Sequence, residues 1–382
     1  MSVAGVTSTG SKMPDILFGP DATGVPQQMV HAHGCTVRDT NGREYLDFIM
    51  GLGAVALGYG NAAVDQAVHA AVARGAIGPL PPEDEAALAD ELRAMIPCLE
   101  EVRFLKTGAE AVAAAVRIAR VATGRDHILG CGYHGWLDWC NTGPGTPNAT
   151  QSLFGRIPFN DAEGTRTAIR AAGDRLACVV VEPVIDAAPT AEWLAVLRTE
   201  TQRIGALLVI DEIKTAFRIA LGGATETWHL EPDLIVLGKA LANGYPLAVV
   251  GGRAAIMRAV ERTWISSTLA TEGVSLAAAR VTIAEIKAHE VPAHLASIGT
   301  RLLNGLKELA SRDATGGIHS KGIPQMCYLR YDDEARSQRV AAECARRGLL
   351  FKRTAYNFVS LAHDDASIDL ALKTLGEVLA SC

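Results

Sequence analysis

Residues 233–239 read Asp-Leu-Ile-Val-Leu-Gly-Lys, an apolar run that ends in a glycine and a lysine. A second run of the same kind, Ala-Leu-Leu-Val-Ile at 206–210, leads into Asp211 and Glu212. Short runs of branched aliphatic residues with polar residues at their ends are typical of strands buried on both faces of a sheet. The two runs therefore predict strands that end in an amine, Lys239, and in a carboxylate, Asp211.

An amine and a carboxylate at strand ends suit pyridoxal phosphate, a cofactor that needs both. A lysine holds its aldehyde as a Schiff base, and an acid pairs with its ring nitrogen. Because side chains alternate along a strand, Asp211 and Ile213 are expected to share a face, with Ile213 against the plane of the ring. Glu212 and Lys214 are expected to point the other way, which favours Lys239 as the Schiff-base lysine. Such segments are often only solvated strand ends, so the assignment depends on further features.

A phosphate site is the first of these features. Residues 103–106 predict a short extended segment, and residues 111–121 have apolar side chains at helical spacing. Thr107 and Gly108 therefore lie where a helix begins, with free backbone N–H groups and the positive end of the helix dipole. A phosphate dianion binds well at such a position. The alternative is an ordinary Thr-capped helix with Glu110 in its first turn.

Three glycines, Gly130, Gly132 and Gly135, match the G-x-G-x-x-G pattern of a dinucleotide site. That function needs a helix directly after the glycines, but residues 136–145 have the composition of a loop. We therefore reject a dinucleotide site. Glycines on both sides of an aromatic residue instead favour a tight turn that places Tyr133 over a planar ligand.

Taken in order, these segments resemble the class III (ω-type) pyridoxal-phosphate aminotransferases, in particular the glutamate-1-semialdehyde aminomutase type and its aminotransferase relatives. The resemblance runs from about Val37 to the end of the chain, and the shared order of the motifs carries it. The motifs are Thr-Gly-Ala-Glu-Ala at 107–111, Tyr-His-Gly at 133–135, Glu-Pro at 182–183, Asp-Glu-Ile-Lys-Thr-Ala-Phe-Arg at 211–218, Leu-Gly-Lys-Ala at 237–240 and Ser-Thr-Leu at 267–269.

The resemblance implies fold type I of the pyridoxal-phosphate transferases: an α/β fold with a mostly parallel central sheet flanked by helices, and a smaller α+β lobe. It also implies a homodimer with shared active sites, in which Thr268 reaches the phosphate of the partner subunit. Lys239 and Asp211 are the implied catalytic residues. The implied cofactor-binding residues are Thr107, Gly108, Ala109, Tyr133, Glu182, Asp211, Ile213, Lys239 and Thr268.

The sequence departs from the aminomutase pattern at positions near the substrate. Leu52 stands where that enzyme has a tryptophan, residues 184–187 lack its asparagine, and residues 18–23 lack its arginine. Ala109 replaces a common serine or threonine of the phosphate loop, which removes one hydroxyl contact while backbone contacts can remain. These departures leave the cofactor chemistry intact and argue against the aminomutase substrate.

We therefore expect an aminotransferase that moves an amino group between an amine or amino acid and a keto acid or ketone. An intramolecular aminomutase is the main alternative, and the same scaffold would also support a decarboxylase. A nicotinamide dehydrogenase built on the glycines, or a binding protein that keeps the cofactor pocket without turnover, are the alternatives from other classes. Arg218, Arg262 and Arg353 are candidates for binding a substrate carboxylate.

Composition narrows the partners and the location. The 382 residues carry a formal net charge of −6, which disfavours nucleic acid and anionic membranes as partners. No apolar stretch is long enough for a membrane span, and the first 12 residues do not resemble a signal peptide. The eight cysteines are scattered without a C-x-x-C pair, which is typical of a cytoplasmic protein. The histidines and cysteines have no metal-ligand spacing, so no metal is expected.

The order of predicted elements gives a domain division. Residues 1–45 form an N-terminal arm and the start of a hairpin with its turn at Asn41–Gly42, residues 46–289 the large cofactor-binding domain, and residues 290–382 a small C-terminal domain. Strand-like runs alternate with helical ones from Phe104 onward, which predicts a mostly parallel sheet covered on both faces. Helices are predicted over 62–73, 82–95, 191–204 and 277–307.

Overall fold

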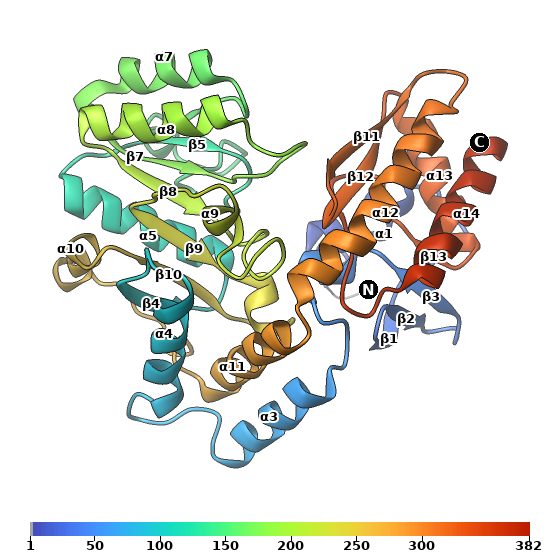
Figure 1. Ribbon diagram of the computed structural model, residues 1–382, viewed down its shortest axis with the longest axis horizontal. Coiled ribbons are helices and arrows are strands. Elements are labelled where there is room, and N and C mark those ends of the chain that lie inside the picture. The colour runs from blue at the N-terminus through green and yellow to red at the C-terminus, as the bar shows by residue number, and fades with distance from the viewer. Residues whose placement is uncertain (1–2) are drawn as a thin grey trace. The chain divides into compact units, whose positions relative to one another are not determined.

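The computed structural model describes residues 3–382, which form two compact units. One unit is the continuous segment Ala63–Ala288. The other combines the chain up to Ala62 with His289–Cys382 (Figure 1).

The continuous unit is built on a sheet of seven strands. Strand β10 runs antiparallel to both of its neighbours, and the other adjacent pairs are parallel. The carboxyl ends of all strands except β10 therefore meet at one edge of the sheet. In spatial order the strands are β4 (Glu101–Leu105), β10 (Ala248–Gly252), β9 (Leu234–Leu237), β8 (Leu207–Asp211), β7 (Leu176–Val181), β5 (His127–Cys131) and β6 (Phe154–Arg156).

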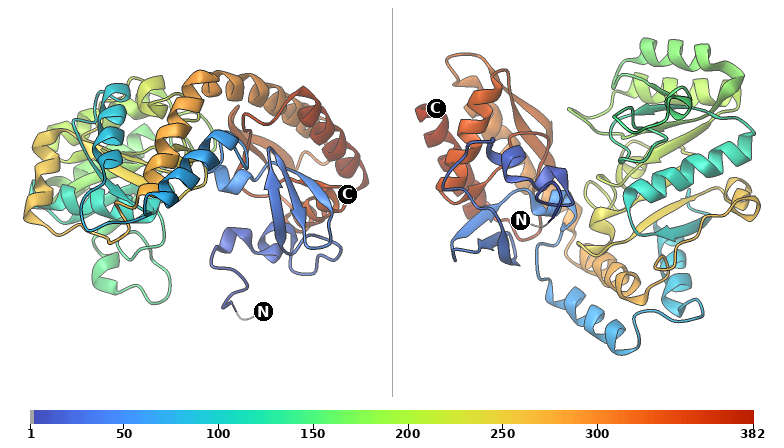
Figure 2. Two further views of the ribbon diagram at one scale, coloured as in Figure 1. Left: turned by 90° about the horizontal axis from the view of Figure 1, so that it is seen from below. Right: turned by 180° about the vertical axis from the view of Figure 1, so that it is seen from behind.

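Helices cover both faces of this sheet (Figures 1 and 2). Val180 and Val209 pack with the apolar side of one covering helix, α5, and Val179 and Ile210 pack with α7 and α8 on the opposite face. Adjacent residues of one strand thus face different helices, which explains why the strands are apolar throughout rather than alternating. The covering helices are α5 (Gly108–Thr123), α7 (Ala162–Ala172) and α8 (Ala191–Ile204).

The remaining helices of this unit lie beside the sheet or in its connections. Helices α4 and α11 are joined by the ion pairs of Arg280 with Asp84 and Glu91. These helices are α3 (Ala62–Ala73), α4 (Glu83–Met95), α6 (Asn148–Gln151), η2 (Gly173–Arg175), α9 (Gly223–Thr227), η3 (Lys239–Ala242), α10 (Ala254–Met257), η4 (Arg258–Arg262) and α11 (Gly273–Ala288).

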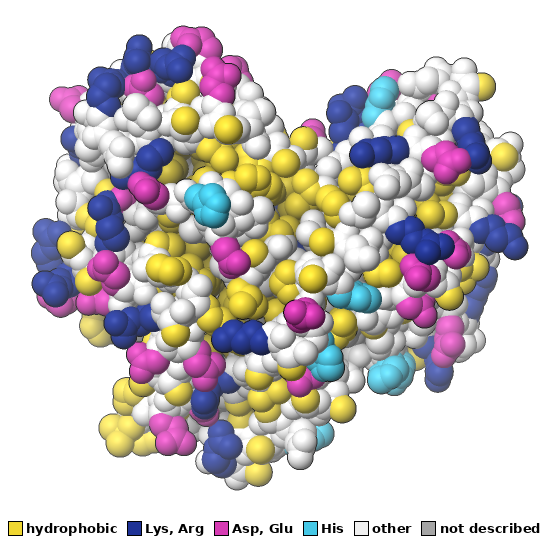
Figure 3. Space-filling view, in the orientation of Figure 1, with side chains coloured by type: hydrophobic (Ala, Val, Ile, Leu, Met, Phe, Trp, Pro, Cys, Tyr) yellow, Lys and Arg dark blue, Asp and Glu magenta, His cyan; other side chains and the backbone are white. Residues whose placement is uncertain are grey.

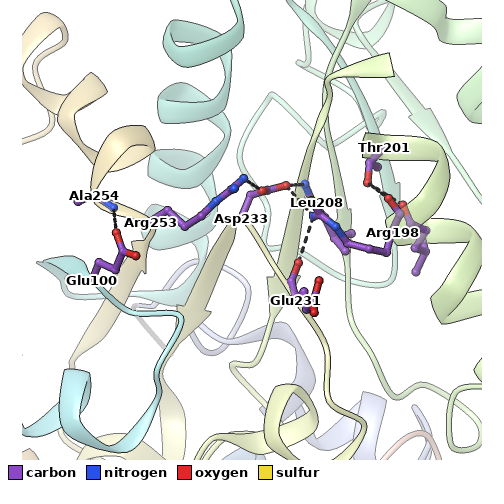
Figure 4. Close-up of polar contacts among 9 residues, drawn as sticks. Glu100, Arg198, Thr201, Leu208, Glu231, Asp233, Arg253 and Ala254 are labelled. Atoms are coloured by element: carbon purple, nitrogen blue, oxygen red, sulfur yellow. Dashed lines mark hydrogen bonds and ion pairs between the residues drawn. The ribbon is translucent and has the colours of Figure 1, made fainter. Parts of the chain in front are cut away.

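A buried carboxylate joins three strands and a helix at the amino end of β9 (Figure 4). Asp233 Oδ2 lies 3.0 Å from Arg198 Nη1 of α8 and accepts a hydrogen bond of 2.7 Å from the Leu208 N–H of β8. Its other oxygen pairs with Arg253, which follows β10. Arg198 also donates to the Glu231 carbonyl. This network therefore lies at the amino end of β9, whereas Lys239 follows its carboxyl end.

The second unit contains two smaller sheets and their helices. One sheet has the strand order β1 (Met29–His33), β2 (Thr36–Asp39), β3 (Glu44–Asp47) and β13 (Leu349–Leu350), and the other β11 (Ile318–Ile323), β12 (Met326–Tyr331) and β14 (Asn357–Phe358). The helices are η1 (Gly10–Lys12), α1 (Pro14–Phe18), α2 (Met50–Gly53), α12 (Val291–Ser311), α13 (Glu334–Arg346) and α14 (Asp365–Ser381). β2 and β3 form the hairpin that was expected around Asn41–Gly42.

The observed division differs from the sequence-based one near the N-terminus. Residues 46–62 group with the C-terminal segment rather than with the large domain. The reason is a parallel pairing of β3 with β13, in which Leu46 lies opposite Leu349 and Asp47 opposite Leu350. Local sequence patterns do not report such distant partners.

The single helix expected over 277–307 is two helices. Glu290 has a left-handed backbone conformation, with φ 46°, and separates α11 from α12. A non-glycine residue rarely adopts this conformation inside a helix. The break lies next to the boundary between the two units at Ala288 and His289.

Charged side chains of both signs lie on the surface of the molecule (Figure 3). On the face shown in Figure 3, acidic and basic side chains are interspersed. Among residues 3–382, no helix is both long enough and apolar enough to cross a membrane.

Candidate active site

Five strands of the continuous unit deliver the candidate residues to one edge of the sheet. Thr107 follows β4, Tyr133 follows β5, Glu182 follows β7, Asp211 ends β8 and Lys239 follows β9. Ligands of open α/β sheets bind at this edge, where strand ends and loops leave room.

Lys239 is the first residue of η3, and its amine makes no hydrogen bond or ion pair with any residue in 3–382. The pKa of this amine is lowered to about 8, chiefly because the amine is buried. The positive charges of Lys214 and Arg218 contribute to this lowering of the pKa, and the carboxylates of Glu182 and Asp211 oppose it. Because a buried ammonium is disfavoured, a larger share of this amine is neutral at physiological pH than for an exposed lysine.

Asp211 is buried and held at both oxygens. Its Oδ2 lies 2.8 Å from His134 Nδ1, and its Oδ1 accepts a hydrogen bond of 3.2 Å from the Ile213 N–H. An ionised carboxylate only accepts hydrogen bonds, so His134 carries a proton on Nδ1. Its Nε2 is buried and has no partner within residues 3–382. No role was predicted for His134, and its position next to Tyr133 was the only indication in the sequence of a role at the site.

Glu182 joins the end of β7 to the turn that carries Tyr133. Its Oε2 accepts a hydrogen bond of 2.9 Å from the Tyr133 N–H, and its Oε1 lies 2.9 Å from Lys214 Nζ. Gly132 has φ 108°, and a Cβ at this position would lie 2.5 Å from Glu182 Oε2. Only glycine fits here, because both the backbone conformation and the close approach exclude a side chain.

The position of Lys214 corrects the sequence-based expectation. Strand β8 ends at Asp211, so the alternation of side chains does not extend to Lys214. Glu212 points into the protein and accepts hydrogen bonds from Thr225, while Lys214 pairs with Glu182 beside Lys239. Two lysines therefore lie at this site.

Ile213 packs between the phosphate loop and the lysine segment. A Cβ on Gly108 would lie 2.6 Å from Ile213 Cδ1, and one on Gly238 would lie 3.7 Å from the Ile213 side chain. The turn after β8, rather than strand alternation, brings Ile213 next to Asp211.

The segment at Thr107 is a capped helix start and also leaves backbone N–H groups available for a phosphate. Thr107 Oγ1 accepts from the Glu110 N–H at 3.2 Å, and Glu110 Oε2 accepts from the Thr107 N–H at 2.9 Å, which is a capping box. The N–H groups of Gly108 and Ala109 have no acceptor in the described chain and remain available to an anion. A Cβ on Gly135 would lie 2.5 Å from Ala109 Cβ, so the aromatic turn touches this loop.

Tyr133 and Thr268 are exposed within this chain. Tyr133 is 70% exposed although its backbone is held by Glu182. Thr268 lies in an exposed turn and does not cap α11, because the Glu272 carboxylate accepts the hydrogen bonds of the first N–H groups of that helix. Glu272 also lies 2.5 Å from Lys106, next to the phosphate loop.

The three arginine candidates differ in their surroundings. Arg218 is fully buried, which lowers its pKa to about 10, and its charge acts on Lys239. Arg262 donates to the Val121 carbonyl, and Arg353, in the other unit, donates to the Ile16 carbonyl.

These residues fit pyridoxal phosphate. The site offers an amine without a partner, a buried carboxylate backed by a histidine, two unbonded amides at a helix N-terminus and an isoleucine against a glycine cradle. No group of three or more potential metal ligands occurs among residues 3–382.

The chain belongs to the class-III aminotransferase family, whose model matches residues 19–379. It is a pyridoxal-phosphate-dependent enzyme with the fold type I architecture of the transaminases. The predicted family, fold class and cofactor are thereby confirmed.

Relatives in this family include glutamate-1-semialdehyde 2,1-aminomutases. The protein of this name from Pyrobaculum calidifontis is 36% identical over 70% of this chain and 66% of its own length. That from Neisseria gonorrhoeae is 31% identical over 97% of this chain and 95% of its own length. The structure of the FumI protein of Sphingopyxis sp. MTA144, in a form that holds pyridoxal phosphate, is similar with a TM-score of 0.89 and 25% identity, covering 97% of this chain and 91% of that one.

Proposed function

We propose that Lys239 is the covalent anchor of the cofactor in a reaction that transfers an amino group from an amine or amino acid to a keto acid or ketone. The observation that carries this proposal is an unbonded amine of lowered pKa at the end of β9, beside the carboxylate that ends β8. When bound, pyridoxal phosphate supplies an aldehyde that takes up the amino group and a ring that withdraws electrons from the substrate carbon.

Lys239 has two tasks in this proposal. It would hold the cofactor covalently through its neutral amine, and the lowered pKa makes more of that neutral form available. In addition, its amine would serve as the base and acid that moves the substrate proton during amino transfer.

Asp211 would keep the proton on the ring nitrogen of the cofactor. Its two oxygens are fixed by His134 and by the Ile213 N–H, so the carboxylate cannot rotate away. Ile213 and Tyr133 would hold the ring through apolar contacts. The N–H groups of Gly108 and Ala109 would hold the phosphate, aided by the dipole of α5.

The proposal also covers assembly. The family resemblance favours a homodimer in which Thr268 completes the phosphate site of the partner subunit. An exposed Thr268 that is not needed to cap α11 supports this role. The scattered and unpaired cysteines support a cytoplasmic location.

An intramolecular aminomutase is the second candidate, because the relatives from Pyrobaculum calidifontis and Neisseria gonorrhoeae carry that name. The substitutions at Leu52, in 18–23 and in 184–187 favour transfer between two molecules. A screen of amine donors and carbonyl acceptors separates the two candidates, since an aminomutase needs no second substrate.

Borohydride reduction of the holoenzyme followed by peptide mapping tests the anchor. The label should appear on Lys239, and Lys239→Ala should lose both the label and turnover by several orders of magnitude while the chain still folds. Lys287→Met, an exposed change on α11, is the matched control and should behave as the unchanged enzyme. Labelling of Lys214 would show that the anchor is misassigned.

A further inference from the structure

Lys214 and Glu182 form an ion pair that is almost closed to solvent. Lys214 Nζ lies 2.9 Å from Glu182 Oε1, and their side chains are 9% and 8% exposed. Charges removed from water to this degree are costly unless each is well paired. The lysine is therefore part of the site and not a solvated side chain at the end of a strand.

The second oxygen of Glu182 extends this pair to the aromatic turn. Glu182 Oε2 accepts the Tyr133 N–H at 2.9 Å, and Gly132 leaves no space between the turn and the carboxylate. Lys214 thus pairs with the same carboxylate, Glu182, that accepts the hydrogen bond of the Tyr133 backbone.

Both charges of the pair also act on the amine of Lys239. The charged groups that act on this amine are Lys214 and Arg218, which are positive, and Glu182 and Asp211, which are negative. Asp211 is itself hydrogen-bonded to His134. Removal of Lys214 and removal of Glu182 must therefore change the charge felt by Lys239 in opposite directions.

We propose that Lys214 is a positioning residue of the amino-transfer site: its ammonium holds Glu182 against the turn of Tyr133 and keeps a second positive charge beside the amine of Lys239. This inference rests on the proposed function, in which Lys239 is the anchor. It gives the lysine of the Asp-Glu-Ile-Lys motif a role that a neutral side chain of equal length could not fill.

The test measures the amine itself and not turnover. The full chain without cofactor is treated with trace acetic anhydride over a range of pH, and acetylation of Lys239 is followed by peptide mass. In Lys214→Met the midpoint should rise by about one pH unit, and in Glu182→Gln it should fall by a similar amount. The double variant should return toward the unchanged chain, and Lys214→Arg, which keeps the charge, should keep the midpoint. Lys287→Met is again the control.

If the ion pair only stabilised the turn of Tyr133, a different pattern would result. Loss of either partner would then loosen the turn in the same way, so Lys214→Met and Glu182→Gln would shift the midpoint in the same direction. Shifts in the same direction, or no shift in Lys214→Met, overturn the inference. If Lys214→Met does not fold, an unchanged midpoint in Lys214→Arg with a lowered one in Glu182→Gln supports it, and any other combination overturns it. Borohydride labelling of the holoenzyme separates the two proposals: a label away from Lys239 defeats the proposed function, whereas a label on Lys239 with the wrong shifts defeats only this inference.

Discussion

Two hydrogen-bonding partners hold the Asp211 carboxylate: the Ile213 N–H in the following turn and His134 after β5. This arrangement fixes the direction in which the carboxylate can receive a ring N–H. With the orientation of the carboxylate fixed, the proposed chemistry depends on its negative charge.

Replacing Asp211 by asparagine should keep the cofactor bound and slow removal of the substrate proton by about 10²–10³-fold, because a neutral amide cannot stabilise the positive ring. Single-turnover kinetics with an amine donor measure this step. Asp138→Asn, which changes an exposed acid near the same turn, should have the normal rate. A normal rate in Asp211→Asn would remove the role given to this residue.

The sequence was sufficient to place Lys239 and Asp211 at neighbouring strand ends, because parallel strands bring their ends together. The partners of these residues did not follow in the same way. His134 and Lys214 lie in turns, where no periodic rule gives the direction of a side chain. Alternation was extended beyond the last residue of β8 and therefore placed Lys214 on the wrong side.

At the scale of elements, the start of α5 depends on the absence of a side chain at Gly108. In Gly108→Ala the new Cβ would meet Ile213 Cδ1 at 2.6 Å, so the isoleucine proposed to contact the ring must move. Cofactor affinity should fall by about tenfold or more, a loss near the usual cost of overpacking. Equilibrium titration of the cofactor-free chain measures this change. Gly78→Ala, whose Cβ would meet nothing closer than 3.9 Å, should bind normally, and equal affinities in the two variants would contradict the proposed ring position.

The network at the other edge of the sheet should affect stability without affecting the site. Asp233→Ala leaves Arg198 without its buried partner and the Leu208 N–H without an acceptor. The free energy of unfolding should fall by about 3–5 kcal/mol, measured by denaturant titration. Arg253→Ala should cost about 1 kcal/mol or less, because its side chain is half exposed and Arg198 still pairs with Asp233. Equal losses in both variants, or loss of the borohydride label on Lys239, would contradict this separation.

Local signals were reliable where an element has both a periodic face and defined ends. Helix α8 was predicted over its observed residues, and it begins at the Thr190 cap and ends at Gly205 in a left-handed conformation. The break at Glu290 was missed, although Pro292 in the first turn of α12 was a usable signal. The pairing of Leu46 with Leu349 had no local signal, so the division near residue 46 could not be predicted.

At the scale of the whole molecule, the proposed dimer can be tested by mixing subunits. Chains with Lys239→Ala and chains with Thr268→Glu should each form inactive homodimers. If sites are shared, a heterodimer contains one site with both lesions and one site with none. Mixing equal amounts should therefore restore about one quarter of full activity. Mixing each variant with itself is the control, and heterodimers without activity would show that Thr268 serves its own chain.

The pairing of β3 with β13 also sets the order in which the chain can fold during its synthesis. Ala63–Ala288 is continuous, so its sheet has every strand as soon as this segment has left the ribosome. The other unit must wait, because partners such as Arg43 and Arg346 are 303 residues apart. Until then the edge of β3 that later receives β13 is open to strands of other nascent chains. The N-terminal hairpin is therefore the segment whose strand edge waits for its partner until the end of the chain has been made.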